Sequence, residues 1–373
     1  MNLVDDKLLV GRKIEEEFDE FLTKTKPLKW GILGLGRIAN LFAREILASG
    51  GQIHAVASRN LQKALDFQNT FGSGRYGLRY ETTPGSPEGA GGGIISKAYG
   101  TYEELLQDDD VQAVYIATPQ SEHLSNASAA LNMGKPILVE KPLTCNFEEA
   151  EKLFELAQEK KLFAMEAMWM RFLPHIRKVK KIIQSGQIGE VVSLYADHGQ
   201  LFPYNPEHRL YSTELGGGAL LDLGVYLVNF AHYILGTPKS VIATGAVSKT
   251  GVDVNLSAVL GYDNGALASL NTTLLSTTQT TASISGTLGR IDIHSPFYRP
   301  TNFTITMNDS SSFEYYGKCE QRGLFGRDGS YGMHFEVAEV SRCIANGELQ
   351  SKVMTWADSL SVLKTMDRIA QEL

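Results

Sequence analysis

Cysteine is scarce in this sequence, and the few cysteines lie far apart. Only three occur among the 373 residues: Cys145, Cys319 and Cys343. An odd number at this spacing supports neither a disulfide framework nor a cysteine-ligated zinc site. We therefore expect no metal site and a reducing compartment, the cytoplasm.

Long apolar runs and an excess of basic residues are also missing. No window approaches the ~20 consecutive apolar residues of a membrane span, so we expect no membrane partner. The 35 Lys and Arg residues are outnumbered by 42 Asp and Glu, which gives a formal net charge of −7. Because a phosphate backbone requires a basic binding face, this balance argues against a nucleic-acid partner.

The length of the chain predicts more than one domain, because a single core rarely grows beyond ~250–300 residues. The composition, 43% hydrophobic and 21% charged, is that of an ordinary globular protein. Residues 1–27 are too acidic for a usual secretory or transit peptide, and apolar spacing predicts an amphipathic helix over residues 13–23. We expect this helical extension to precede a nucleotide-binding domain over residues 28–145 and a second domain over residues 146–373.

A glycine-rich turn follows the first predicted strand, residues 28–33. It reads GLGRIA from Gly34 onward, fits the pattern G-x-G-x-x-A and opens a predicted helix. Gly34 permits the tight turn, and Gly36 lets the backbone approach a pyrophosphate. The first helical residues, Arg37 and Ile38, bring free N–H groups toward the phosphates. Strand, turn and helix in this order predict a dinucleotide site in a Rossmann-type α/β domain.

The second predicted strand, residues 53–57, ends in Ser58 and Arg59. A site for NAD usually has a carboxylate here, which accepts a hydrogen bond from the ribose 2′-hydroxyl. A hydroxyl and a guanidinium suit the 2′-phosphate of NADP instead, because a carboxylate would repel that group. The alternative is that Arg59 is an ordinary surface charge. We favour NADP as the cofactor.

The rest of the parallel sheet is predicted from a strand at residues 111–117 and another that ends at Lys141. An irregular insertion, residues 72–96, is dense in Gly, Pro and Ser and should lie opposite the cofactor crevice, because loops that precede a strand lie there. The residues expected at the crevice follow the two strands: Thr118, Pro119, His123, Glu140 and Lys141. The sequence leaves two roles possible for His123, a contact with the cofactor or a local hydrogen bond. It also leaves two for Lys141, a solvent-exposed end of the strand or a catalytic residue.

The second half of the chain changes to helices and antiparallel strands. Two predicted strands flank the turn DNG at residues 263–265, and strands joined by so tight a turn must be antiparallel. This domain is therefore predicted to be α+β. Three glycines at residues 216–218 open an apolar helix in which Asp222 and Tyr226 are one turn apart. An acid inside an apolar helix, such as Asp222, needs a partner. Tyr226 alone could instead be an ordinary core tyrosine whose hydroxyl is hydrogen-bonded.

The order of these motifs resembles the glucose–fructose oxidoreductase and inositol dehydrogenase family. The motifs are GILGLGRIA, ATPQSEH, EKP, MEAMWMRF and GGGALLDLGVY. Within that family the chain is most similar to the group of dimeric dihydrodiol dehydrogenases and NADP-dependent D-xylose dehydrogenases. The resemblance covers residues 28–373. It implies a Rossmann domain, an α/β domain with an open, mostly antiparallel sheet, and a homodimer formed through the outer face of that sheet. The N-terminal helix and the insertion depart from the family pattern.

The resemblance also implies roles for single residues. Lys141 matches the active-site lysine beside the nicotinamide, Tyr226 the catalytic acid/base, and Asp222 the residue that orients substrate hydroxyls. Trp169 and Arg171 match a pair that reaches back to the cofactor. The unperturbed pKa of a tyrosine is about 10, so we expect the Lys141 ammonium to stabilise the phenolate and lower the pKa of Tyr226.

These features predict an NADP-dependent oxidoreductase that transfers a hydride between the nicotinamide and a CH–OH group of an aldose or trans-dihydrodiol. Two alternatives keep the same family: a keto-sugar reductase and a sugar–sugar oxidoreductase. A third is a non-catalytic, NADP-binding regulatory protein. The family commonly has a cis bond before the proline of EKP, so we also expect a cis Lys141–Pro142 peptide.

Overall fold

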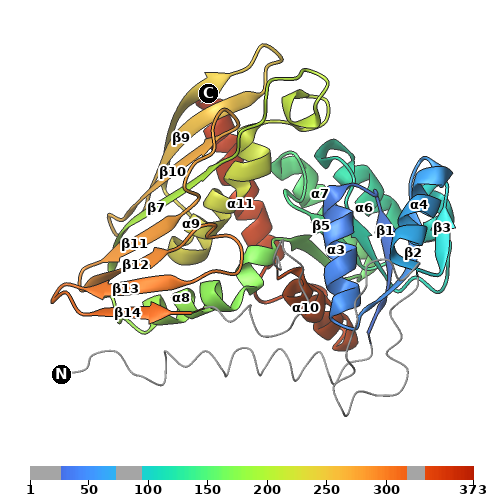
Figure 1. The fold of residues 1–373 in the computed structure, drawn as a ribbon, viewed down its shortest axis with the longest axis horizontal. Coiled ribbons are helices and arrows are strands. Elements are labelled where there is room, and N and C mark those ends of the chain that lie inside the picture. Colours follow the sequence, from blue (N-terminus) through green and yellow to red (C-terminus); the bar gives the residue numbers. More distant parts are fainter. Residues whose placement is uncertain (1–26, 73–94, 317–331) are drawn as a thin grey trace.

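The computed structural model describes residues 27–72, 95–316 and 332–373 (Figure 1). The expected N-terminal helix, the body of the expected insertion and Cys319 lie outside these ranges. Within them, no helix combines the length and the apolar character needed to cross a membrane.

The first sheet has six parallel strands in the order β3-β2-β1-β4-β5-β6. Its strands are β1 Lys29–Leu33, β2 Gln52–Ala57, β3 Lys97–Tyr99, β4 Ala113–Ile116, β5 Ile137–Glu140 and β6 Ala164–Ala167. Its connecting helices are α3 Arg37–Ala48, α4 Leu61–Gly72, α5 Tyr102–Leu106, α6 His123–Asn132 and α7 Phe147–Lys160. The strand order reverses between β1 and β4, which is where sheets of this kind bind ligands. The predicted Rossmann-type arrangement is confirmed.

The first sheet extends beyond the boundary expected at residue 145. β6 pairs with β5 in parallel, with Glu166 opposite Val139, and so joins the nucleotide-binding sheet. The chain then passes through the short helix η2 (Trp169–Phe172) and α8 (Pro174–Gln184) before it begins the second sheet.

The second sheet has eight strands in the order β14-β13-β12-β11-β7-β10-β9-β8. They are β7 Val191–Gly199, β8 Ser240–Val247, β9 Asp253–Gly261, β10 Leu267–Thr273, β11 Ala282–Gly286, β12 Gly289–Ile293, β13 Phe303–Met307 and β14 Ser312–Tyr315. Only β7 and β10 pair in parallel, and the predicted hairpin of β9 and β10 is antiparallel. Helices α9 (Val225–Leu235) and α11 (Trp356–Gln371) pack against this sheet (Figure 1). The predicted mostly antiparallel second domain is confirmed.

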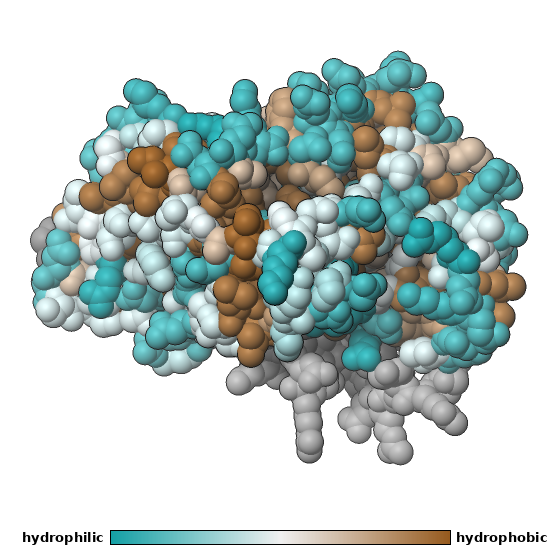
Figure 2. All heavy atoms as spheres, turned by 90° about the horizontal axis from the view of Figure 1, so that it is seen from above, coloured by the Kyte–Doolittle hydropathy of each residue, from teal (hydrophilic) through white to brown (hydrophobic). Residues whose placement is uncertain are grey.

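The opposite face of the second sheet carries exposed apolar side chains. Ile242 of β8 lies opposite Val259 of β9, and the row continues through Ser269 of β10 to Tyr195 of β7. The side chains of Ile242, Val259 and Tyr195 are 68%, 38% and 47% exposed. Figure 2, which views the molecule from above, shows apolar patches between hydrophilic areas of the surface.

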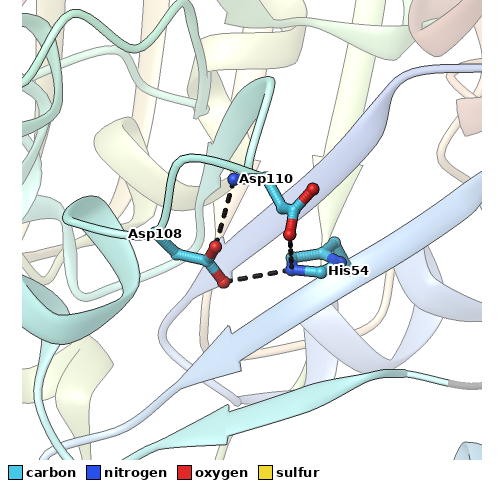
Figure 3. A group of neighbouring side chains, drawn as sticks. All are labelled: His54, Asp108 and Asp110. Atoms are coloured by element: carbon cyan, nitrogen blue, oxygen red, sulfur yellow. Dashed lines mark hydrogen bonds and ion pairs between the residues drawn. The ribbon is translucent and has the colours of Figure 1, made fainter.

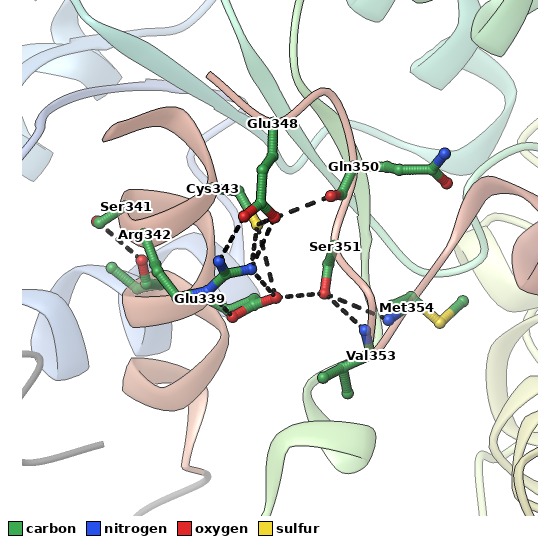
Figure 4. Close-up of polar contacts among 10 residues, drawn as sticks. Glu339, Ser341, Arg342, Cys343, Glu348, Gln350, Ser351, Val353 and Met354 are labelled. Atoms are coloured by element: carbon green, nitrogen blue, oxygen red, sulfur yellow. Dashed lines mark hydrogen bonds and ion pairs between the residues drawn. The ribbon is translucent and has the colours of Figure 1, made fainter. Parts of the chain in front are cut away.

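Helix α10 (Met333–Ala345) returns from the second sheet to pack against α3 of the first (Figure 1). At its start, the Met333 N–H donates to the Glu45 carboxylate of α3 at 2.6 Å. At its end, Arg342 donates to Glu339 at 2.8 Å and to Glu348 at 2.7 Å (Figure 4). The Met333–Glu45 bond ties α10 to α3 of the first domain, and the Arg342 contacts hold the end of α10 to the loop that follows it.

Candidate active site

The turn after β1 has the shape that a dinucleotide requires. Gly34 has φ +84°, and a Cβ there would lie 2.7 Å from the carbonyl oxygen of Ala117, directly after the neighbouring strand β4. A Cβ on Gly36 would instead meet nothing within 4 Å. Gly34 is therefore fixed by the fold, whereas the space at Gly36, just before α3 begins at Arg37, is open to a ligand.

Ser58 and Arg59 lie at the end of β2, as expected from the sequence. Ser58 is buried, and its hydroxyl accepts a hydrogen bond from the Asn60 N–H at 3.3 Å. The Arg59 side chain is 70% exposed and forms an ion pair with Glu122 at 2.9 Å. Because salt bridges at the surface are weak, this pair leaves the guanidinium available to a 2′-phosphate. The ion pair of Glu122 with Arg59 was not predicted from the sequence.

His123 and Thr118 follow β4 at the predicted place. The buried imidazole of His123 lies between the carbonyl oxygens of Thr118, 3.0 Å from Nε2, and Pro142, 2.9 Å from Nδ1. Both ring nitrogens are therefore engaged by the protein itself. Of the two roles left open by the sequence, this geometry supports the local one. His123 links the loop after β4 to the loop after β5.

Lys141 lies at the end of β5 and reaches across to the second domain. Its Nζ donates to the backbone carbonyl of Asp222 at 2.7 Å and lies 3.6 Å from the Asp222 carboxylate. It also lies 4.9 Å from the ring centroid of Tyr226. The structure thus brings the three predicted catalytic residues together, two of them from helical segments of the second domain. The predicted cis Lys141–Pro142 peptide is confirmed.

Asp222 lies in a π-helical turn, η4 (Leu220–Gly224), directly before α9. Such turns interrupt the regular helical ladder and are frequent at functional sites. Burial alone would raise the pKa of Asp222, but Lys141 and Arg209 together lower it below its ordinary value. The buried Asp222 carboxylate therefore has two cationic partners. One is Lys141, and the other is Arg209, whose guanidinium donates to the carboxylate at 3.1 Å.

Arg209 was missed by the sequence analysis. It lies in η3 (Arg209–Tyr211), 13 residues before Asp222. The two residues belong to different elements, so no helix or strand repeat predicts that they meet. The only signal was the glycine triad: a Cβ on Gly217 would lie 2.7 Å from the carbonyl oxygens of Arg209 and Leu210. Because glycine has no side chain, the loop that carries Arg209 can pass close to the backbone at Gly217.

Tyr226 is buried in a group of aromatic rings. Its ring centroid lies 5.6 Å from those of Trp169 and His198, and 4.6 Å from that of Tyr298. Among the described residues, its hydroxyl has no hydrogen-bond partner. Burial, followed by the nearby carboxyl group of Glu140, raises the pKa of Tyr226 well above its ordinary value.

This direction is the opposite of the expected lowering by Lys141. The ammonium lies over the face of the Tyr226 ring and donates to the Asp222 carbonyl, not to the phenol oxygen. Glu140 is itself buried, and burial raises its pKa to about 7, although the Tyr115 hydroxyl bonded to it acts in the other direction. The phenol therefore keeps its proton at neutral pH in the structure as it stands.

Trp169 and Arg171 are held by the second domain. The Trp169 indole N–H donates to the Tyr298 carbonyl at 3.0 Å, which places the indole beside Tyr226. Arg171 is buried, donates to Asn229 of α9 at 2.6 Å and pairs with Asp358 of α11 at 3.0 Å. Trp169 therefore lies at the site. Arg171 also donates to the backbone carbonyl of Val353 at 3.4 Å, and these contacts support a structural position for it.

One group of potential metal ligands lies elsewhere. His54, Asp108 and Asp110 offer ligand atoms within 4.8 Å of one another (Figure 3). Both carboxylates are already engaged by lysines: Lys97 lies 3.1 Å from Asp108, and Lys29 lies 2.8 Å from Asp110. These ion pairs neutralise the charge that would attract a cation, so the group is a structural network.

Comparison with known proteins agrees with this arrangement. Residues 28–168 match an oxidoreductase family with an NAD-binding Rossmann fold, and residues 176–292 match the GFO/IDH/MocA C-terminal domain. The chain is 30% identical to a D-xylose 1-dehydrogenase (NADP(+)) from Hypocrea jecorina over 92% of both chains. It is 32% identical to a trans-1,2-dihydrobenzene-1,2-diol dehydrogenase from Xenopus tropicalis, over 92% of this chain and 98% of the other.

A solved structure shows the same fold. The 3-ketoreductase KijD10 from Actinomadura kijaniata, in complex with NADP and TDP-benzene, is 26% identical with a TM-score of 0.75. The match covers 93% of this chain and 98% of the ketoreductase.

Proposed function

Because the chain belongs to the GFO/IDH/MocA oxidoreductase family, we propose that it transfers a hydride between NADP and a CH–OH group of an aldose or a trans-dihydrodiol. The observation that carries this proposal is the meeting of Lys141, Asp222 and Tyr226 at the junction of the two sheets. One cation, one carboxylate and one phenol with a free hydroxyl are the groups that proton transfer to or from a sugar hydroxyl requires.

The cofactor would be held by the carboxyl ends of the parallel strands. The open space at Gly36 and the first N–H groups of α3, at Arg37 and Ile38, suit the pyrophosphate. Ser58 and Arg59 suit the 2′-phosphate, which is why we propose NADP over NAD. Further contacts are proposed at the ends of β4 and β5 and at η2: Thr118, Pro119, Glu140, Lys141 and Trp169. When bound, NADP supplies or accepts the hydride.

The protein residues then manage one proton and the orientation of the substrate. The Tyr226 hydroxyl exchanges a proton with the oxygen of the reacting carbon. Lys141 places a positive charge beside that oxygen, and its bond to the Asp222 carbonyl fixes its direction. The Asp222 carboxylate, ionised because its pKa is lowered, accepts hydrogen bonds from substrate hydroxyls and orients them.

Reduction of a carbonyl is a second candidate direction, and the raised pKa of Tyr226 favours it. A phenol that keeps its proton at neutral pH is ready to donate it to a developing alkoxide. In the oxidative direction, Tyr226 must first lose that proton. A keto-sugar reductase therefore remains a candidate beside the dehydrogenase.

The proposal is tested by following nicotinamide absorbance in both directions. NADP⁺ is supplied with D-xylose, D-glucose or trans-1,2-dihydrobenzene-1,2-diol, and NADPH with keto sugars. Turnover of any of these substrates supports the proposed function. Tight NADPH binding without turnover of any of them would contradict it and favour a regulatory NADP-binding protein.

Two further features complete the proposal. We place the protein in the cytoplasm, where its cofactor and small-molecule substrates occur. We also propose a homodimer formed through the exposed face of the second sheet, where Ile242, Val259 and Tyr195 form an apolar row.

A further inference from the structure

A second polar group lies beside Tyr226 and has no part in the proton transfer described above. It begins with His198, near the end of β7, whose buried imidazole packs 4.5 Å from the ring of Tyr298 and 5.6 Å from that of Tyr226. Gln200 follows, directly after the strand, and is half-buried. The backbone N–H of Gln200 donates to Thr273 of β10 at 3.1 Å, which fixes the residue at the edge of the site.

The orientation of the Gln200 amide is set by these neighbours. Its nitrogen, Nε2, lies 2.9 Å from His198 Nε2 and 3.4 Å from the Tyr298 hydroxyl. Burial, and then Lys141, lowers the pKa of His198 to about 4, so the imidazole is neutral and accepts from the amide N–H. The amide nitrogen is thus engaged on both sides, and the amide oxygen is left to face away from His198 and Tyr298.

Two atoms of this group lack a partner. Among the described residues, Gln200 Oε1 makes no hydrogen bond. His198 Nδ1, which carries the imidazole proton, is buried and has no hydrogen-bond partner among the described residues. Leaving a buried polar atom without a partner is costly. Gln200 Oε1 is not buried, so a ligand beside the proposed acid/base can reach it and supply its missing hydrogen bond.

We propose that Gln200 determines substrate specificity: its amide oxygen accepts a hydrogen bond from a substrate hydroxyl remote from the reacting carbon. His198 and Tyr298 are positioning residues that aim the amide. This inference rests on the proposed function and narrows it to a polyhydroxylated sugar. A trans-dihydrodiol carries its two hydroxyls on adjacent carbons, so the apolar diene part of its ring would face the amide and leave the amide oxygen unpaired.

The test compares two substrates in one variant. Gln200→Leu keeps the size of the side chain and removes the acceptor. With NADP⁺, kcat/KM for D-xylose and D-glucose should fall about 10- to 100-fold, mainly through KM, because one hydrogen bond to a buried group is lost. The value for trans-1,2-dihydrobenzene-1,2-diol should stay unchanged or rise. Gln107→Leu, an exposed glutamine at the end of α5, is the control and should change neither value.

His198→Phe tests the positioning role. It keeps an aromatic ring against Tyr226 and Tyr298 but cannot accept from Gln200. KM for the aldoses should rise while kcat and the dihydrodiol values stay near those of the unchanged protein. A fall in kcat for both substrate classes would show that His198 only supports Tyr226, and would overturn this part of the inference.

Equal losses for sugars and dihydrodiol in Gln200→Leu would overturn the specificity proposal while leaving the proposed function intact. If the unchanged protein turns over neither class, equilibrium dialysis of labelled D-xylose and D-glucose in the presence of NADPH decides the question. Binding that weakens at least about 10-fold in Gln200→Leu supports the inference. Equal binding by both proteins, or no sugar binding at all, overturns it.

Discussion

At the scale of single residues, Tyr226 has a hydroxyl that is free for substrate and a proton that burial holds in place. Tyr226→Phe removes the hydroxyl and preserves the ring that packs against Trp169 and Tyr298. We expect kcat to fall by about 10²- to 10⁴-fold, the usual contribution of a positioned acid or base. NADPH affinity, measured by fluorescence titration, should stay the same. Full activity in this variant would remove Tyr226 from the mechanism.

We propose that Arg59 decides the choice between NADP and NAD. Arg59→Ala should lower the preference for NADP about 10-fold or more, because a charge-assisted hydrogen bond to the 2′-phosphate is lost. The measurement is the ratio of kcat/KM for the two cofactors.

Glu122 provides the matched variant for that experiment. It pairs with Arg59 at 2.9 Å, so Glu122→Gln should release the guanidinium and raise the NADP preference. An unchanged ratio in both variants would show that the 2′-phosphate is held elsewhere.

At the scale of elements, α10 buries a carboxyl group where it packs against α3. Glu336 is fully buried, and within the described part of the chain neither of its carboxylate oxygens has a hydrogen-bond partner. Burial raises its pKa well above the ordinary 4.5, and the neighbouring carboxyl groups of Glu140 and Glu45 act in the same direction. Because the pKa of Glu336 is higher in the folded than in the unfolded state, its contribution to the stability of the protein is fully present below about pH 4.5. That contribution is lost as the pH rises toward the folded-state pKa.

Glu336→Gln should therefore stabilise the protein at high pH. We expect the free energy of unfolding at pH 8 to rise by about 1–3 kcal/mol, because glutamine cannot ionise and so removes the penalty that the raised pKa of Glu336 imposes at this pH. At pH 4.5 the two proteins should differ little. Urea unfolding at the two pH values makes the measurement.

Glu339, one turn further along α10, is the control for Glu336. Its carboxylate is bonded to Arg342 and Ser351, and these bonds lower its pKa although burial alone would raise it. Glu339→Gln should destabilise the protein at pH 8, because a lowered pKa contributes stability above the unfolded-state value. A stability gain in Glu339→Gln as well would show that the pH argument for Glu336 is wrong.

The elements also show which parts of the site could be predicted from the sequence. Strand, glycine turn and helix follow one another within a few residues, so local pattern sufficed to place Gly34, Gly36 and the end of β5. The π-helical turn at Asp222 leaves no such pattern, because it differs from an α-helix by one hydrogen-bond step. Arg209 and Gln200 come from a loop and a strand end, where contacts depend on tertiary packing and not on spacing.

The pKa of Tyr226 was predicted in the wrong direction for a related reason. The sequence places a lysine near a phenol but does not show which atom the ammonium bonds. In the structure it bonds the Asp222 carbonyl, and burial then dominates the pKa of the phenol. Proximity alone could be inferred, whereas the balance between desolvation and charge required the geometry.

At the scale of the whole molecule, the candidate active site lies on one side of the second sheet, and in the part of the chain that the structure describes the other face of this sheet exposes apolar side chains. That face presents Tyr195, Ile242 and Val259 in a row across three neighbouring pairs of strands, and Leu267, 51% exposed, lies beside them on β10. An apolar row of this kind is a common interface signal, and a second copy of the same face would cover it symmetrically.

The homodimer can be tested by placing a charge in that row. Val259→Lys should convert the dimer to a monomer in light scattering coupled to size-exclusion chromatography, because a buried unpaired charge is costly at an interface. Met133→Lys, at an exposed apolar residue after α6, should leave the dimer intact. Since Lys141, Asp222 and Tyr226 all come from one chain, the monomer should keep its activity per site. A chain that is monomeric before any substitution would refute the interface, and loss of activity in a folded monomer would show that the partner supports the site.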